Sequence, residues 1–197
     1  MLDGDGESGL SFRALAGRLK TGPGAIYWHV ANKSELLVAA TDAVLADVLA
    51  ADASGETPQD AIRTVALGVF DAIDAHPWIG AQLSRLASQS ATLQIFERIG
   101  RQVQALGVPG AAQFDSASAL LNYILGVGGQ NAANARAQEP GTSRADVLGA
   151  ESALWSRLDP DQYPFIRGIA GQLRDHDDRA QFLAGIDLIL AGIAALR

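Results

Sequence analysis

The sequence predicts an all-α protein, in which a small N-terminal helix-turn-helix domain precedes a larger helical domain. Alternating runs rich in Val, Ile, Thr and aromatic residues are nearly absent, whereas Ala, Leu, Gln and Arg recur with helical spacing. Near the N-terminus, two short helical segments are separated by only three residues. A short break at residues 53–56 follows, and we therefore place the two domains at residues 1–52 and 53–197.

Length and composition narrow the possible classes of protein. A chain of 197 residues with 48% hydrophobic content can bury a substantial core. It has no run of eighteen apolar residues and no basic stretch followed by an apolar one, so we expect a cytoplasmic protein without a membrane partner. Because the chain has no cysteine, disulfides, thiolate metal sites and thiol nucleophiles are excluded.

In the N-terminal domain, we expect a loop or frayed end followed by three helices. Residues 1–9 are rich in Gly and Asp, which disfavours a regular helix. The helix-turn-helix would consist of residues 12–19 and 23–29, and a connector helix would run to about residue 52. Either Asn32 or Ser34 could cap the connector.

The larger domain shows clear helix boundaries at several points. Thr57, Pro58 and Asp60 have the residue types of a helix start, and Gly107 with Pro109 have those of a helix end. The predicted helices span residues 58–75, 77–87, 92–106, 113–137, 145–157, 164–173 and 179–196.

The final helix carries a regular apolar seam and further apolar residues outside it. The seam has spacings of four, three, four and three, and Leu183 and Leu190 lie off it. A helix that is apolar nearly all round is buried on more than one side. The pattern fits a central core helix and a subunit interface equally well. The seam consists of Phe182, Ile186, Ile189, Ile193 and Leu196.

The helix-turn-helix segment coincides with a local excess of positive charge. Residues 8–34 contain four basic side chains and no acidic one, although the formal net charge of the whole chain is -7. Basic side chains neutralise phosphates, which favours a nucleic-acid partner, although a solvated surface could also have this distribution. An apolar inner face would hold the two short helices together through Leu10, Leu15, Ala16, Leu19 and Ile26.

The motif residues resemble the DNA-binding domain of the tetracycline repressor (TetR) family. The segments GLSFRALA at residues 9–16 and AIYWHVANKSELL at residues 25–37 carry the resemblance, and weaker similarity continues through residues 76–78, 106–108, 123–126 and 182–193. It implies a ligand-responsive regulator, most simply a repressor that leaves a palindromic operator when a small-molecule effector binds. It also implies a homodimer formed through residues 113–137 and 179–196.

Two departures from the family pattern concern the N-terminal domain. Lys20 occupies the turn position that is commonly Gly in the family, and Gly22 follows two residues later. The family normally has a complete helix before the position of Gly9, where this chain has eight residues, so we expect a truncated first helix.

The resemblance assigns roles to individual residues of the motif. In the family, the second helix of the motif enters the major groove with its N-terminal end against the bases. Here that end is small or apolar, so Arg13 is the expected base reader, suited to O6 and N7 of guanine. Packing is the favoured role of Trp28. The expected DNA-binding residues are Ser11, Phe12, Arg13, Thr21, Gly22, Pro23, Gly24, Ala25, Tyr27, His29 and Lys33.

The resemblance also implies a ligand pocket in the larger domain. Only His76 and His176 lie outside the motif, so the histidine set with which tetracycline repressors bind a metal-complexed drug is not matched. We therefore expect no metal, no cofactor, and an apolar or aromatic effector. Residues of the predicted helices whose side chains carry a polar group could line the pocket: Trp78, Asn122, Tyr123, Gln130, Asn131, Asn134 and Trp155.

Two other classes of function compete with the regulator. An enzyme would need a catalytic motif, and the best candidate, the glycine-rich residues 126–129, lies in a helical pattern without the preceding strand of a phosphate-binding loop. Asp175, Asp177 and Asp178 fit a solvated turn and helix start better than a pair of catalytic acids. We expect no enzyme. A helical interaction protein that has lost DNA binding is the other alternative.

Overall fold

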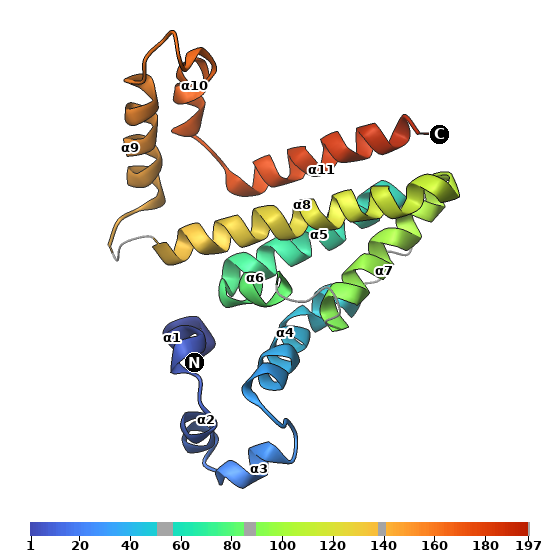
Figure 1. Ribbon diagram of the computed structural model, residues 1–197, viewed down its shortest axis with the longest axis vertical. Helices are drawn as coiled ribbons and strands as arrows, with labels where there is room; N and C mark the ends of the chain where they lie inside the picture. Colours follow the sequence, from blue (N-terminus) through green and yellow to red (C-terminus); the bar gives the residue numbers. More distant parts are fainter. Residues whose placement is uncertain (51–56, 85–89, 138–140, 197) are drawn as a thin grey trace. The chain divides into compact units, whose positions relative to one another are not determined.

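The structure, a computed structural model, describes residues 1–50, 57–84, 90–137 and 141–196. Within these ranges the regular elements are α-helices and one 3-10 segment, which confirms the all-α prediction (Figure 1). The chain divides into two compact units. Unit 1 comprises Met1–Arg136 and Phe182–Arg197, and unit 2 comprises Ala137–Gln181. The predicted boundary between residues 52 and 53 lies outside the described residues.

Four helices form the N-terminal part of unit 1. The helix-turn-helix and the connector lie close to their predicted bounds, although the second motif helix ends two residues earlier than expected. The prediction that residues 1–9 form a loop or frayed end was wrong, because they form a helix that is kinked at Gly6. The elements are α1 (Leu2–Gly9), α2 (Phe12–Leu19), α3 (Pro23–Tyr27) and α4 (Lys33–Ala50).

Two of the remaining helices of unit 1 follow predicted signals, α5 (Pro58–Ala75) at its start and α7 (Ser90–Ala105) at its end. The Thr57 hydroxyl accepts a hydrogen bond from the Asp60 amide at 3.2 Å, and Gly107 takes a positive φ of 77° after α7. The second helix ends at Leu83 and not near residue 87, and the fourth begins at Gly110 and not at residue 113. These helices are α5 (Pro58–Ala75), α6 (Trp78–Leu83), α7 (Ser90–Ala105), α8 (Gly110–Ala137) and α11 (Asp178–Ala194), the last beginning in unit 2.

The core of unit 1 lies where α5, α7, α8 and α11 supply fully buried side chains. The Phe182 ring stacks on Phe70 with a centroid separation of 4.6 Å and on Tyr123 with one of 5.6 Å, which joins α11 to α5 and α8. Further buried residues of this core are Val69, Ile73, Ile95, Ile99, Leu120, Ile124 and Ile186.

The apolar pattern of α11 is only partly buried in the protomer. Its buried stripe consists of Phe182, Ile186, Leu190 and Ile193, so Leu190 takes the place predicted for Ile189. Leu196 is exposed, and Leu188, on another face, is 76% exposed. The expectation that α11 is buried on more than one side therefore does not hold within one chain.

Unit 2 is a small helical unit formed by α9 (Arg144–Ser156), α10 (Pro164–Ile169) and η1 (Ala170–Leu173). Ser143 and Asp146 form a capping box at the start of α9. The buried Ser152 hydroxyl donates to the Ala170 carbonyl at 2.8 Å and so joins α9 to η1.

Candidate nucleic-acid interface

The first motif helix, α2, begins with a side-chain cap that places Arg13 in its first turn. The Ser11 hydroxyl accepts a hydrogen bond from the Ala14 amide at 3.1 Å. Arg13 follows two residues after this cap, and its side chain is exposed. Ser11 is therefore the N-cap of α2, and its exposed side chain can also contact another molecule.

Apolar packing joins α2 to α3. Leu10, Ala16 and Ile26 are buried, as predicted for the inner face of the motif. The rings of Phe12 and Tyr27 meet edge to face with centroids 4.5 Å apart, so Phe12 supports the second helix. Leu19 was wrongly assigned to the inner face: it is the last residue of α2 and is 60% exposed.

The turn between the motif helices brings five predicted DNA-binding residues together. Lys20 adopts a left-handed conformation after α2, and Gly22 then serves as the N-cap of α3, with Pro23 as its first residue. A proline suits the first position of a helix, because the N–H group that it lacks would have no acceptor within the helix there. The exposed residues gathered here are Thr21, Gly22, Pro23, Gly24 and Ala25.

The segment after α3 exposes two rings. The prediction that Trp28 packs inward was wrong, since its side chain is 90% exposed. Because α3 ends at Tyr27, Trp28 and His29 belong to the turn that follows, where helical spacing no longer determines which side chains face inward. An exposed tryptophan beside exposed Tyr27 and His29 gives this surface flat groups that can lie against another molecule.

The basic side chains of the motif are largely uncompensated. Arg13, Arg18 and Lys20 are exposed, and none of them forms an ion pair with another described residue. Lys33 differs from them, because its ammonium group donates to the Glu7 carbonyl. The motif therefore presents positive charge to solvent on a chain whose net charge is -7.

The connector helix α4 is fixed at its start by Asn32. The side-chain oxygen Oδ1 of Asn32 accepts a hydrogen bond from the Glu35 backbone amide at 2.9 Å, and the Glu35 carboxylate accepts one from the Ala31 backbone amide at 2.7 Å. Of the two caps considered from the sequence, Asn32 is the one observed.

Helix α1 attaches the motif to α6 through two carboxylates. Asp3 Oδ1 accepts from Trp78 Nε1 at 2.8 Å and lies 2.7 Å from His76 Nδ1, while Glu7 accepts from the Gln82 amide. The hydrogen bond with His76 lowers the pKa of Asp3 below its ordinary value. These contacts explain the unpredicted helix: Asp3 and Glu7 lie on either side of the kink at Gly6, and their partners lie more than seventy residues away.

Helix α4 attaches to the rest of unit 1 near its C-terminal end. Arg98 Nη1 of α7 donates to the Val48 carbonyl at 3.1 Å. A Cβ atom added at Gly68 of α5 would lie only 2.7 Å from Val48 Cγ1, so α4 and α5 approach closely at this glycine. The motif is thus joined to the larger set of helices both through α1 and through α4.

The predicted pocket residues lie in different surroundings. Trp78 is buried and bonded to Asp3, and Tyr123 stacks in the core. Asn131 is half-buried on α8, and Trp155 is half-buried on α9 of unit 2. Asn122, Gln130 and Asn134 are exposed on α8 at spacings of eight and four residues, which places them on one outward face.

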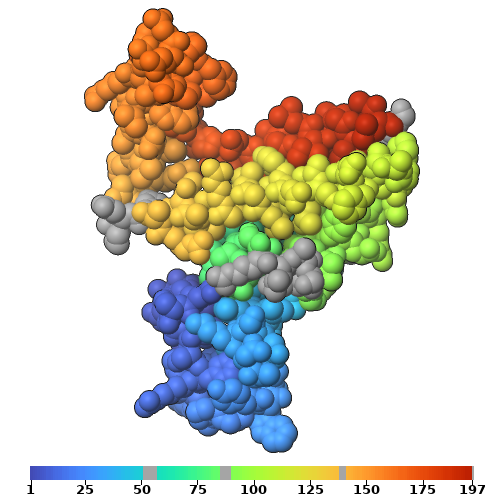
Figure 2. Space-filling view, in the orientation of Figure 1, coloured from blue at the N-terminus to red at the C-terminus, as the bar shows by residue number. Residues whose placement is uncertain are grey.

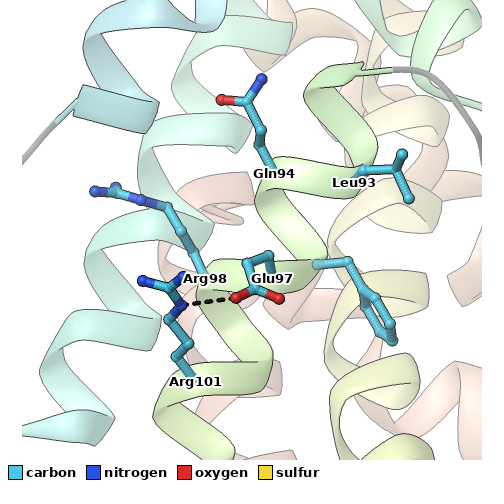
Figure 3. A pocket seen from close by; sticks show the side chains of 6 residues that line it. Leu93, Gln94, Glu97, Arg98 and Arg101 are labelled. Atoms are coloured by element: carbon cyan, nitrogen blue, oxygen red, sulfur yellow. Dashed lines mark hydrogen bonds and ion pairs between the residues drawn. The ribbon is translucent and has the colours of Figure 1, made fainter.

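A solvent-open depression of about 510 Å³ lies on α7 and contains none of the predicted pocket residues (Figure 3). Its side chains all come from this helix, and Arg101 Nε donates to Glu97 Oε1 at 2.7 Å across it. The other lining residues are Leu93, Gln94, Phe96 and Arg98.

The glycine-rich segment considered for an enzyme lies inside α8 and supports helix packing. A Cβ atom at Gly128 would lie 2.6 Å from Ile73 Cδ1, and one at Gly80 would lie 3.4 Å from the Gly129 backbone. Asp177, also considered, caps α11 by accepting from the amides of Arg179 and Ala180 at 2.9 Å.

Between residues 1 and 196, leaving out the three undescribed segments, no group of three or more His, Asp or Glu side chains could hold a metal ion. In the same ranges no helix is long and apolar enough to cross a membrane.

Comparison with known sequences connects these features to regulators of transcription. Residues 52–197 match the family described as "Tetracyclin repressor-like, C-terminal domain". An HTH-type transcriptional regulator from Saccharopolyspora erythraea is 30% identical over 203 residues, and the match covers 99% of this chain and 80% of that protein.

Solved structures show the same fold. The transcriptional regulator SCO7222, a TetR from Streptomyces coelicolor, is 55% identical with a TM-score of 0.89, and the match covers 99% of this chain and 92% of that one. BioQ with its natural double-stranded DNA operator is 25% identical with a TM-score of 0.66, over 98% and 91% of the two chains.

Proposed function

Because the chain belongs to the TetR family of transcriptional regulators, we propose that it is a homodimeric repressor that leaves a palindromic operator when a small-molecule effector binds. The observation that carries the DNA-binding part is the acid-free helix-turn-helix with its exposed Arg13, Arg18 and Lys20, which form no ion pair with the residues that the structure describes. A surface of this kind binds phosphates even when the whole protein is acidic, since the local charge determines the attraction.

Within the motif, Arg13 is the base reader. Its exposed guanidinium can bond O6 and N7 of guanine with two parallel hydrogen bonds, whereas the N-terminal end of α3 offers only small side chains and backbone groups to the groove. Ser11, Thr21, Tyr27, His29 and Lys33 position the motif on phosphates. Phe12 acts through Tyr27, against which it packs.

The dimer forms through the outward faces of α8 and α11. Phe114 of α8 is 70% exposed and Leu188 of α11 is 76% exposed, an arrangement that is costly in water and that a second copy would relieve. Asn122, Gln130 and Asn134 are further exposed side chains of α8. Two-fold symmetry of this dimer requires an operator with two inverted half-sites.

Effector response follows from the two attachments of the motif. An effector bound among the larger set of helices changes operator affinity only if it favours the conformation that binds DNA poorly. A shift of α6 acts on α1 through Asp3, and a shift of α7 acts on α4 through the Arg98 bond to Val48. Within unit 1, Trp78, Tyr123 and Asn131 remain our candidates for effector contacts.

The test of the repressor is salt-dependent binding to the DNA that flanks its gene, measured by fluorescence anisotropy with a scrambled duplex as reference. We expect preference for the flanking DNA and an affinity that falls steeply as salt rises. Arg13→Ala should lose about 1–3 kcal/mol of that preference for each half-site. Arg101→Ala, which removes an exposed arginine of α7, is the matched control and should bind as the wild type does.

Two results would overturn the proposal. If no flanking duplex is preferred over the scrambled one at any salt concentration, the chain is an interaction protein and not a repressor. If sedimentation shows the same mass for the wild type and Leu188→Asp, the proposed dimer face is wrong, because a buried charge at that position should leave monomers.

A further inference from the structure

Lys20 holds an unusual backbone conformation at the turn of the helix-turn-helix. Its φ and ψ are 54° and 41°, and it is the one non-glycine with positive φ among the described residues. The Lys20 amide donates to the Gly17 carbonyl at 3.3 Å, and the Thr21 amide donates to the Ala16 carbonyl at 3.0 Å. This pair of bonds ends a helix most easily with glycine in the left-handed position, because a Cβ atom is disfavoured there.

The lysine side chain makes no contact that compensates for this conformation. It is exposed, and its ammonium group has neither an ion pair nor a hydrogen bond with any residue of the described ranges. At Gly107 and Gly141, where the chain also takes a positive φ, it uses glycine. The turn has its two backbone hydrogen bonds but no side-chain contact of Lys20 within the described ranges, and a non-glycine held in this region points to a role in binding another molecule.

We propose that Lys20 is a DNA-positioning residue, whose ammonium group binds a phosphate beside the groove that α3 enters. This inference rests on the proposed function. Lys20 lies two residues before Gly22, the N-cap of α3, and like Arg13 and Arg18 of the motif it is exposed. In the complex, the contact between the ammonium group and a phosphate adds affinity and so offsets the cost of the strained turn. This contact does not read the base sequence.

A structural explanation competes with this one. A cation at the C-terminus of a helix is favoured by the helix dipole, and Lys20 follows the last residue of α2. The two explanations differ in what removal of the charge changes. Loss of a dipole contact lowers the stability of the free protein, whereas loss of a phosphate contact lowers DNA affinity and its salt dependence.

The experiment compares the wild type with Lys20→Gly and Lys20→Gln by thermal unfolding without DNA and by operator titration at 50–200 mM salt. Arg101→Gln is the control for a change in total charge. Lys20→Gly should raise the ratio of folded to unfolded protein about fivefold, because glycine suits the left-handed turn. Both Lys20 variants should lower the magnitude of the slope of log affinity against log salt concentration by about 0.9 per protomer. For a dimer, the ratio of wild-type to variant affinity should therefore fall about tenfold between 50 and 200 mM salt.

Each alternative outcome is decisive. Wild-type slopes for both Lys20 variants would overturn the phosphate contact, as would a loss of stability in Lys20→Gln with unchanged DNA binding. If Arg101→Gln lowers the slope equally, net charge and not position is responsible, and the inference is again wrong. If the wild type itself prefers no flanking duplex, the proposed function fails first and the role of Lys20 with it.

Discussion

Replacing Gly185 with alanine tests the packing of α8 against α11 at its closest point. A Cβ atom at position 185 would lie 1.9 Å from Tyr123 Oη and 2.3 Å from Tyr123 Cζ. The tyrosine cannot turn aside freely, since its ring stacks on fully buried Phe182 and its hydroxyl donates to the Phe182 carbonyl at 3.3 Å. The added methyl group therefore displaces either the ring or the helix.

The expected cost follows from three contributions. Overpacking of a filled interior costs about 1–3 kcal/mol. Loss of the Tyr123 hydrogen bond costs about 1 kcal/mol more, while the gain in helix propensity from Gly to Ala returns about 1 kcal/mol. We therefore expect Gly185→Ala to lower the free energy of unfolding by about 1–3 kcal/mol.

Urea unfolding followed by circular dichroism measures this difference, with protein concentration held constant because the proposed dimer would unfold at a concentration-dependent midpoint. Gly100→Ala on α7 is the matched control: nothing lies within 4 Å of its added Cβ, so it should be neutral or slightly stabilising. Combining Gly185→Ala with Tyr123→Ala should cost about 1–3 kcal/mol less than the sum of the two changes. Equal stability of Gly185→Ala and Gly100→Ala would refute this account of the α8 and α11 contact.

Three smaller changes test other parts of the fold. Because the pKa of Asp3 is lowered in the folded state, its contribution to stability is complete above its ordinary pKa of 3.8 and is lost as pH falls through the lowered value. Asp3→Asn should therefore be less stable than the wild type at pH 7 and equally stable in acid. Unfolding at a series of pH values measures this difference, and a difference that does not change with pH would contradict the prediction. Asn32→Ala removes the cap of α4 and should cost about 1 kcal/mol in thermal unfolding, together with operator affinity, whereas Asn32→Ser should restore both. Ser152→Ala leaves the Ala170 carbonyl without its donor and should speed amide exchange in unit 2 while exchange in unit 1 stays unchanged; a uniform effect would show that the units do not unfold separately.

Helices with local start and stop signals could be predicted from the sequence. Thr57 and Asp60 determine the start of α5 by a bond between residues three apart, and Gly107 ends α7 through its own backbone conformation. Such signals do not depend on distant parts of the chain. The resemblance of residues 9–37 to a known motif similarly identified the helix-turn-helix correctly.

Features that depend on distant contacts were missed. Helix α1 contains several glycines and has poor helix propensity. It is held by the bonds of Asp3 and Glu7 to α6, and no local sequence pattern predicts those partners. Trp28 was assigned to packing by its size, yet it follows the last residue of a five-residue helix and is exposed. The pocket candidates were chosen for their polar groups alone and stay a prediction, although three of them are exposed on α8.

The attachment of the helix-turn-helix limits how it can move. It is joined to α6 through Asp3, to α7 through the Val48 carbonyl, and to the core through buried Leu45 of α4. If the proposed dimer forms, a displacement of α6 or α7 would therefore carry the motif with it and change the spacing of the two motifs on DNA.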